Sequence, residues 1–242
     1  MTIQLPKINV LLATYNGEAY LIDQLDSIFS QVGVSVTVYA RDDGSSDSTV
    51  SILESYVSSG RPIKLLSGID GGGSAAKNFI ELILNADVIA DTCVCFADQD
   101  DIWLPTKLKT ALNSIDQGYD LYSSALTVFS AEKDGMSTLR GEVVFTDYDY
   151  LFQGLSAGCT YMLSSSFYSF VRSQIESNKA ILNADFSHDW LIYTMARSFK
   201  YSIFHDSSST ILYRQHSLNV QGALTGLQGF LYRAKNIWNH LY

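Results

Sequence analysis

Cysteine is scarce in this chain: only Cys93, Cys95 and Cys159 occur among its 242 residues. Cys93 and Cys95 are two positions apart, so in a strand both would point to the same face, and such near neighbours rarely have disulfide geometry. The odd number of cysteines also argues against the disulfide framework of a small secreted protein. We therefore expect reduced thiols and a cytoplasmic protein.

Basic residues are scarce as well. The chain has 16 Lys and Arg against 25 Asp and Glu, which gives a formal net charge of −9, and the basic residues form no block. This balance argues against binding to duplex nucleic acid, whose phosphates need clustered positive charge. An acidic protein can still bind an anionic ligand where a metal ion supplies the positive charge.

Long apolar runs are missing, although apolar residues make up 47% of the chain. No stretch reaches the length of a transmembrane helix. The apolar run within the N-terminal MTIQLPKINVLLATYNG is too short for a signal peptide, and no small-residue cleavage site follows it. We expect a globular domain with ample core material, and any contact with a membrane should be peripheral.

The first hundred residues alternate between two patterns. Short runs of apolar residues, typical of buried strands, are followed by segments with apolar residues at helical spacing. This alternation predicts an α/β fold with right-handed crossovers and a mostly parallel central sheet flanked by helices. The predicted strands are 8–15, 36–40, 63–66 and 92–97, and the predicted helices are 18–31, 45–59 and 74–86.

The second half of the chain is less regular. A polar, turn-rich segment at 132–142 interrupts it. We predict helices over 104–115 and 188–199, and strands over 119–130, 200–204 and 209–216. Residues 221–242 have one apolar face with Arg233 and Lys235 beside it, which is typical of an amphipathic helix that lies on a membrane or packs against protein. No helix-stop signal follows, so we expect this helix to be truncated.

Polar segments follow three of the predicted strands. TYNGE follows the first, RDDGSSD the second and DQDD the fourth. In an open α/β sheet, ligands bind beyond the carboxyl ends of the strands. Because parallel strands bring these ends to one edge, we expect the three segments to form one ligand site.

The segment CFADQDDIW gathers Asp98, Asp100 and Asp101 where a buried strand ends. In an extended segment Asp98 and Asp100 share a face, so both can reach one ion. Mg²⁺ or Mn²⁺ prefers oxygen ligands and would bridge such carboxylates to a diphosphate. The alternative interpretation is a solvated acidic loop or a cap for the helix that follows.

The other two polar segments allow more than one interpretation. RDDGSSDST either forms a turn into a capped helix or presents Asp42 or Asp43 to the imide N–H of a uracil or thymine base. TYNGE precedes a helix, whose free backbone N–H groups can bind an anion. Neither TYNGE nor GGGSAAKNF matches a dinucleotide fingerprint or a P-loop.

Taken together, LLATYNGEAYLIDQLDSI, RDDGSSDST, AAKNF and FADQDDIWLPTKL resemble the nucleotide-binding half of family 2 glycosyltransferases, inverting enzymes with the GT-A (Rossmann-like) fold. SAGCTYML, HDWLI and YRQHSLNV are similar to the branch containing bacterial rhamnosyltransferases of cell-surface polysaccharide synthesis. The motifs are specific in combination. The resemblance implies one GT-A domain, with a nucleotide-sugar-binding half at 1–103, a less regular acceptor-binding and catalytic half at 104–220, and a C-terminal helix at 221–242.

The resemblance also implies roles for individual residues. Asp189 matches the general base that takes a proton from the acceptor hydroxyl. Asp98, Asp100 and His216 match a site for Mn²⁺ or Mg²⁺. The implied nucleotide-binding residues are Thr14, Tyr15, Asn16, Glu18, Asp42, Asp43, Lys77 and Asp98.

Three positions also have a purely structural interpretation. Asp189 with His188 would lie at a helix N-terminus as a capping carboxylate. His216 would be a satisfied structural histidine. Cys159 has no activating partner evident in the sequence, so we expect a small buried hydrophobe rather than a nucleophile.

The resulting hypothesis is a metal-dependent inverting glycosyltransferase. The implied donor is dTDP-L-rhamnose, or otherwise a UDP-sugar, and the implied acceptor is a surface polysaccharide or an undecaprenyl-linked saccharide. The resemblance places such a protein at the inner face of the bacterial membrane, and a homodimer is one further assembly to test. Two alternatives are a nucleotidyltransferase, which normally has a Gly- and basic-rich phosphate loop near its N-terminus, and a catalytically inactive sugar-nucleotide-binding module.

Overall fold

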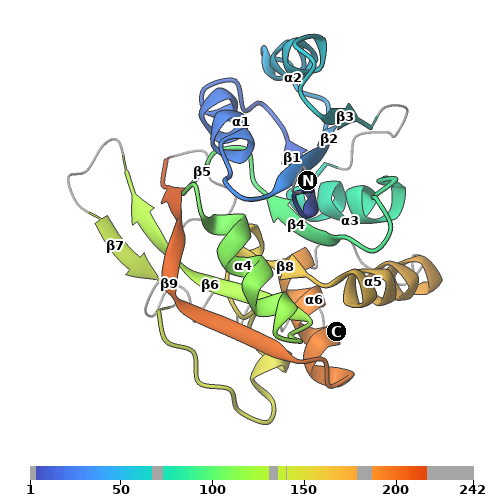
Figure 1. Cartoon of the computed structure of the whole chain (residues 1–242), viewed down its shortest axis with the longest axis vertical. Coiled ribbons are helices and arrows are strands. Elements are labelled where there is room, and N and C mark those ends of the chain that lie inside the picture. The colour runs from blue at the N-terminus through green and yellow to red at the C-terminus, as the bar shows by residue number, and fades with distance from the viewer. Residues whose placement is uncertain (1–3, 67–72, 131–135, 140, 179–186, 217–242) are drawn as a thin grey trace.

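The computed structural model describes residues 4–66, 73–130, 136–139, 141–178 and 187–216, which form one sheet with helices on both faces (Figure 1). The strands are β1 Lys7–Thr14, β2 Ser35–Asp42, β3 Ile63–Leu65, β4 Cys93–Ala97, β5 Ile102–Trp103, β6 Leu121–Phe129, β7 Met136–Leu139, β8 Met162–Leu163 and β9 Ile203–Arg214. The helices are α1 Leu21–Phe29, α2 Thr49–Ser58, α3 Ala75–Asn85, α4 Lys107–Asp116, α5 Ser165–Asn178 and α6 His188–Ser198, with 3₁₀ turns η1 Asp149–Leu151 and η2 Gly158–Thr160.

The strand order is β3-β2-β1-β4-β8-β6-β9-β5, and β7 pairs with β6 beside this path. β1 pairs in parallel with both β2 and β4, and β2 pairs in parallel with β3. Beyond β4 the pairing is mixed, because β8 runs antiparallel to β4 and β6 while β9 runs parallel to β6. The predicted α/β fold class is confirmed, and the parallel half carries the polar strand ends along one edge.

Two hydrophobic cores lie on opposite faces of the sheet. Side chains alternate along β1, so Val10 and Leu12 join one core and Leu11 joins the other. Helices α1, α2 and α4 contribute to the first core, whereas α3, α5 and α6 contribute to the second. The α6 helix, which the sequence left isolated in the irregular half, is therefore packed on the same face as α3.

The second half differs from the sequence predictions in three places. The two predicted strands at 200–204 and 209–216 are one strand, β9, because the polar residues between them keep pairing with β6 across a register shift. Helix α5 was not predicted, although its buried Phe167, Val171 and Ile175 are spaced by four residues. The turn-rich segment 132–142 contains β7, an edge strand with exposed residues.

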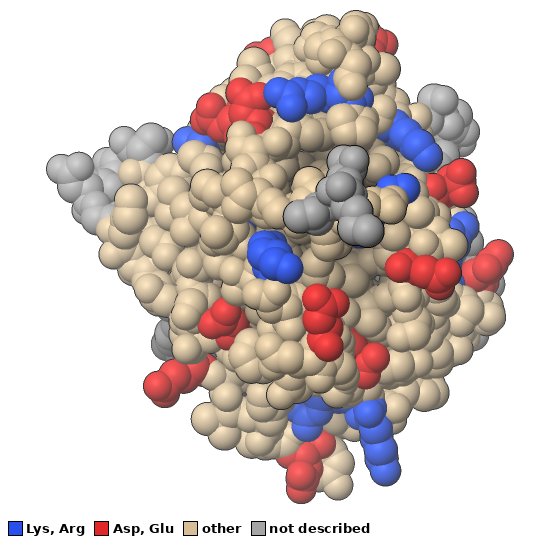
Figure 2. All heavy atoms as spheres, viewed as in Figure 1, with Lys and Arg blue, Asp and Glu red and all other residues tan. Residues whose placement is uncertain are grey.

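The amphipathic helix predicted for residues 221–242 lies outside the described residues. Within the described ranges, none of the helices combines the length and hydropathy that crossing a bilayer requires. The face shown in Figure 2 carries acidic and basic side chains interspersed with one another, without a continuous basic stripe among its described residues.

Candidate active site at the carboxyl edge of the sheet

The carboxyl ends of β1, β2 and β4 meet at one edge, as the sequence predicts. Thr14, the last residue of β1, is paired with Asp42, the last residue of β2. Ala97, at the end of β4, is paired with Leu12 of β1, so the acidic loop after Ala97 begins beside the other two polar segments. The parallel register thus brings together segments that are far apart in the sequence.

Asp42 is held by its own turn. Its carboxylate accepts hydrogen bonds from the backbone N–H groups of Gly44 (3.0 Å) and Ser45 (2.7 Å) and from the Thr14 hydroxyl (2.9 Å). Thr14 is buried, so its hydroxyl contacts the turn from the protein interior. The structure therefore gives Asp42 and Thr14 a turn-forming role, which for Asp42 is the structural interpretation allowed by the sequence, and nucleotide binding by both residues stays a prediction.

Asp43 belongs to a buried network that the sequence analysis missed. The Arg41 guanidinium, on a residue only 1% exposed, bonds to Asp43 at 3.0 Å and to the side-chain oxygen of Asn78 at 2.9 Å. The Asn78 amide in turn donates to the backbone carbonyls of Thr14 (3.1 Å) and Arg41 (3.2 Å). Because Asn78 lies on α3, this network fixes the ends of β1 and β2 to that helix.

The backbone amides of the loop after β1 bond to side chains of neighbouring loops; the expectation that the N-terminus of the following helix binds an anion stays a prediction. The backbone N–H groups of residues 15–18 donate to side chains of Gln99, Ser45, Thr49 and Asp47, respectively. Asn16 and Glu18 return the contact, since their side-chain oxygens accept from the N–H groups of Ser46 and Ser48, both at 2.9 Å. These bonds join the loop to the start of α2 and to the acidic loop.

Tyr15 and Lys77 are nucleotide-site candidates with exposed side chains, as are Asn16 and Glu18. Tyr15 is 55% exposed at the end of β1, although its N–H and carbonyl both bond to Gln99. Lys77 is exposed in the first turn of α3, next to the buried Asn78. Both side chains are therefore accessible to a ligand on this edge of the sheet.

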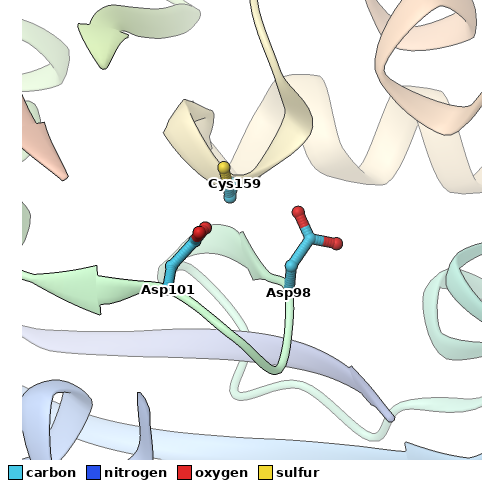
Figure 3. A group of neighbouring side chains, drawn as sticks. All are labelled: Asp98, Asp101 and Cys159. Carbon is cyan, nitrogen blue, oxygen red and sulfur yellow. The ribbon is translucent and has the colours of Figure 1, made fainter. Parts of the chain in front are cut away.

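The acidic loop after β4 splits the predicted metal ligands into two groups. The Asp100 carboxylate lies 2.9 Å from Nε2 of His216, so the predicted proximity of these two residues is present. Asp98 instead lies with Asp101 and Cys159, and one ligand atom from each of these three lies within 4.8 Å of the others. Figure 3 shows both carboxylates directed from the loop toward Cys159 in the facing η2 turn.

Burial and mutual repulsion dominate the electrostatics of these carboxyl groups. Burial, together with the negative charges of Asp100 and Asp189, raises the pKa of Asp98 to about 7. The pKa of Asp101 is also well above its ordinary value, mainly because of burial and then because of the charge on Asp98. A doubly charged cation at this position would relieve both effects.

Asp101 is a site residue that the sequence analysis noticed but did not assign. One carboxylate oxygen accepts from the backbone N–H of Arg214 at 3.3 Å. The other, Oδ2, is buried and has no hydrogen-bond partner among the described residues. A buried carboxylate oxygen without a hydrogen-bond partner, next to the Asp98 carboxylate and the Cys159 thiol, is suited to serve as an oxygen ligand of Mg²⁺ or Mn²⁺.

Asp189 lies in the first turn of α6, where its carboxylate accepts from the Ser187 hydroxyl and from the N–H of Trp190. Its charge contributes to the raised pKa of Asp98, which places it at the acidic loop although the two residues are far apart in the sequence. Asp189 thus has both the N-terminal position in the helix and an electrostatic interaction with the acidic site. The structural and functional interpretations of Asp189 are therefore compatible.

His188, the first residue of α6, anchors the start of the helix through contacts with two aromatic rings. Its ring stacks on Phe79 with centroids 3.9 Å apart and lies 5.3 Å from the ring of Phe96. Burial lowers its pKa to about 4, so the imidazole is neutral at physiological pH. The packed imidazole therefore acts as an apolar support for the residue that follows it, Asp189.

Cys159 is fully buried in the η2 turn, as the structural interpretation predicted. Burial raises the pKa of its thiol well above the ordinary value, and the charges of Asp101 and Asp98 raise it further. A thiol in this environment stays protonated and is a poor nucleophile. The η2 turn therefore covers the carboxylates of Asp98 and Asp101 on the side where Cys159 lies.

The comparisons with known proteins agree with this geometry. The Glycosyl transferase family 2 model matches residues 9–219. The dTDP-rhamnosyl transferase RfbG of Shigella flexneri is 35% identical over 216 residues, covering 88% of this chain and 74% of the relative. The uncharacterized glycosyltransferase YibD of Escherichia coli is 24% identical, covering 88% of this chain and 66% of that protein.

Two solved structures show the same fold at low sequence identity. The S. aureus TarS 1-349 chain in complex with UDP-GlcNAc superposes with a TM-score of 0.65 at 19% identity, over 96% of this chain and 65% of that one. The mannosyltransferase PcManGT from Pyrobaculum calidifontis, in complex with GDP-Man and Mn²⁺, gives 0.60 at 13% identity, over 98% and 63%. This chain therefore spans about two-thirds of each solved chain.

The sheet, its polar carboxyl edge and these structural neighbours define the fold class as GT-A. Within that class the family model covers most of the chain, and a relative above 30% identity covers nearly as much. The chain belongs to glycosyltransferase family 2.

Proposed function

We propose that this glycosyltransferase transfers L-rhamnose from dTDP-L-rhamnose, with inversion, to a hydroxyl of a saccharide or an undecaprenyl-linked saccharide. The 35% identity with a dTDP-rhamnosyl transferase over most of the chain carries the choice of donor. The meeting of Asp98, Asp100 and Asp189 at one edge of the sheet supports catalysis there. A UDP-sugar is the second candidate donor, since the TarS neighbour was solved with UDP-GlcNAc.

The chain's own residues divide the work of inverting transfer between two sides of the site. Asp189 would accept the proton of the acceptor hydroxyl as that oxygen attacks the anomeric carbon. The Ser187 hydroxyl and the Trp190 N–H hold its carboxylate in place, so the base is oriented before the acceptor arrives. The loop after β1, Asp43 and Lys77 would bind the nucleotide, within the half formed by residues 1–103.

Asp98, Asp100 and His216 would hold Mn²⁺ or Mg²⁺, with Asp101 close enough to contribute. When bound, such an ion supplies positive charge to the leaving nucleoside diphosphate. The acceptor would bind the half formed by residues 104–220, on the side of α6. This division fits a protein that works in the cytoplasm at the inner face of the membrane, where an undecaprenyl-linked acceptor is accessible.

Donor assignment can be tested by measuring nucleotide release from dTDP-L-rhamnose and from UDP-sugars, with Mn²⁺, Mg²⁺ or a chelator and a saccharide acceptor. We expect acceptor-dependent release of dTDP that stops on chelation and returns with either metal. Release from a UDP-sugar alone would transfer the proposal to that donor. No transfer from any donor, together with nucleotide binding, would favour the inactive binding module.

Asp189→Asn tests the base, because the amide keeps the shape of the side chain but cannot take up the proton. We expect transfer to fall by at least about a hundredfold while nucleotide affinity stays close to wild type. Asp147→Asn, an exposed aspartate preceding η1, is the matched control and should retain activity. Normal transfer by Asp189→Asn would show that another group is the base.

A further inference from the structure

The end of β9 bridges two parts of the candidate site. Nε of Arg214 donates to the backbone carbonyl of Asp100 at 3.0 Å, and the Arg214 backbone N–H donates to the Asp101 carboxylate at 3.3 Å. The same guanidinium forms an ion pair with Asp23 of α1 at 2.9 Å. One side chain therefore connects the acidic loop with the helix that follows the loop after β1.

Two aromatic rings fix the plane of this guanidinium. Its central carbon lies 4.7 Å from the ring centroid of Tyr20 and 4.9 Å from that of Phe129, and Arg214 is only 9% exposed. Planar stacking and several donors in fixed directions are properties of arginine that lysine lacks. The geometry therefore requires arginine in particular, and not only a positive charge.

Tyr20 makes a second contact to the same region. Its ring centroid lies 4.6 Å from that of His216, whose Nε2 lies 2.9 Å from the Asp100 carboxylate. Asp100 is thus held at its carbonyl by Arg214, the last residue of β9, and at its carboxylate by His216, two residues beyond the strand. Both of these β9-end residues rest on Tyr20 at the N-terminus of α1.

We propose that Arg214 is a positioning residue that sets the orientation of Asp100 for a divalent cation and couples cation binding to nucleotide binding. The inference rests on the proposed function, because it takes the acidic loop as the metal site and the loop before α1 as part of the nucleotide site. Nucleotide that holds the start of α1 also holds Asp23, Arg214 and thereby the Asp100 backbone. By linkage, each ligand then raises the affinity for the other by the same factor.

Manganese binding measured by electron paramagnetic resonance tests the proposal without any reference to activity. Free Mn²⁺ is titrated into the full chain, with and without dTDP, for wild type, Arg214→Lys and Asp23→Asn. We expect Arg214→Lys to weaken Mn²⁺ binding about tenfold, as residues that orient metal ligands commonly do. We expect dTDP to tighten Mn²⁺ binding in wild type and to do so much less in both variants.

Asp23→Asn is the second test variant, included because Arg214→Lys could also impair folding. The Asp23 side chain is 58% exposed, so removing its charge should leave the core intact. Arg197→Lys is the matched control. Arg197 pairs with Asp149 at 2.6 Å and lies against the rings of Tyr150 and Tyr193, and within the described part of the chain its bonds do not reach α1 or the acidic loop. It should lose stability while keeping wild-type Mn²⁺ affinity and coupling.

The outcomes separate this inference from the proposed function. Wild-type Mn²⁺ affinity and wild-type dTDP coupling in both Arg214→Lys and Asp23→Asn would overturn the positioning role, whatever happens to the melting temperature. Asp100→Ala serves as the reference for the metal site itself. If Asp100→Ala binds Mn²⁺ as wild type does, the metal assignment fails and the inference fails with it. If only Asp100→Ala loses Mn²⁺, the metal assignment stands and Arg214 is a structural residue.

Discussion

Gly158 faces the imidazole of His188 so closely that a Cβ atom on Gly158 would lie 2.2 Å from Nε2 and 2.8 Å from Cε1. The imidazole is packed against both Phe79 and Phe96, so it has little room to move away. The Cβ of Asp189 would also be only 3.3 Å away. The η2 turn thus passes directly over the start of α6, and the absence of a side chain at Gly158 permits this approach.

Gly158→Ala should therefore affect both stability and catalysis. We expect overpacking to lower the free energy of unfolding by about 1–3 kcal/mol and to reduce transfer, because displacing His188 moves Asp189. Gly141→Ala is the control, since the nearest atom to its Cβ would be 3.6 Å away. Thermal unfolding and the transfer rate measure the two effects, and a Gly158→Ala protein identical to wild type in both would show that the contact is not restrictive.

The buried imidazole of His188 should make stability depend on pH. Its pKa is about 4 in the folded protein against 6.5 for an ordinary histidine, so the unfolded chain binds a proton first as the pH falls. The contribution of the neutral imidazole to the free energy of unfolding is fully present above pH 6.5. It should be lost as the pH falls toward 4, which lowers the free energy of unfolding by about 3 kcal/mol in total. Urea unfolding across this range, without metal or nucleotide, measures the slope.

His188→Gln isolates that contribution. The variant should be less stable overall because it loses ring stacking, but its stability should fall less steeply on acidification. Asp98 acts in the opposite direction, since its raised pKa lets the folded protein bind a proton first between about pH 7 and 4, and this effect is common to both proteins. Parallel stability curves for wild type and His188→Gln would contradict the buried neutral imidazole.

Asn78→Ala should disconnect α3 from the ends of β1 and β2. The substitution removes one acceptor of the Arg41 guanidinium and one of the donors to each of two carbonyls, which keep bonds from the Asp43 N–H and the Thr14 hydroxyl, so we expect a loss of about 1–3 kcal/mol. Nucleotide affinity should fall as well, because Arg41 also holds Asp43. Asn85→Ala, exposed at the end of the same helix, should stay within about 0.5 kcal/mol of wild type. Urea unfolding measures the free energy of unfolding, and calorimetric titration measures the affinity for dTDP. Equal stability of the two variants would show that the Arg41–Asn78 network does not stabilise the fold.

The three thiols should react slowly with a disulfide reagent in the native protein. Burial raises the pKa of Cys93 to about 11 and that of Cys95 to about 12, and Cys159 is shifted in the same direction. Cys93 is the least buried, so we expect it to react first and the other two only on unfolding. Colour release from Ellman's reagent with and without denaturant measures this order. Rapid native reaction at Cys159, located by Cys159→Ser, would show that the η2 turn opens.

The sequence by itself determined the parallel half of the fold. Residues 8–15, 36–40 and 92–97 are apolar runs whose pattern depends only on neighbours in the chain, and the polar segments after them had to meet once the strands ran in parallel. The aspartates of the acidic loop were identified for the same reason. The second half was less predictable, since the register shift within β9 depends on its pairing with β6.

Only the tertiary structure decided which partner each site residue has. Asp98 shares a group with Asp101 and Cys159, whereas Asp100 faces His216, and one-dimensional spacing cannot distinguish these arrangements. The ion pair between Arg214 and Asp23 joins residues 191 positions apart. Such contacts depend on how β9 packs against α1, because side chains remote in sequence meet only after the helices and strands have assembled.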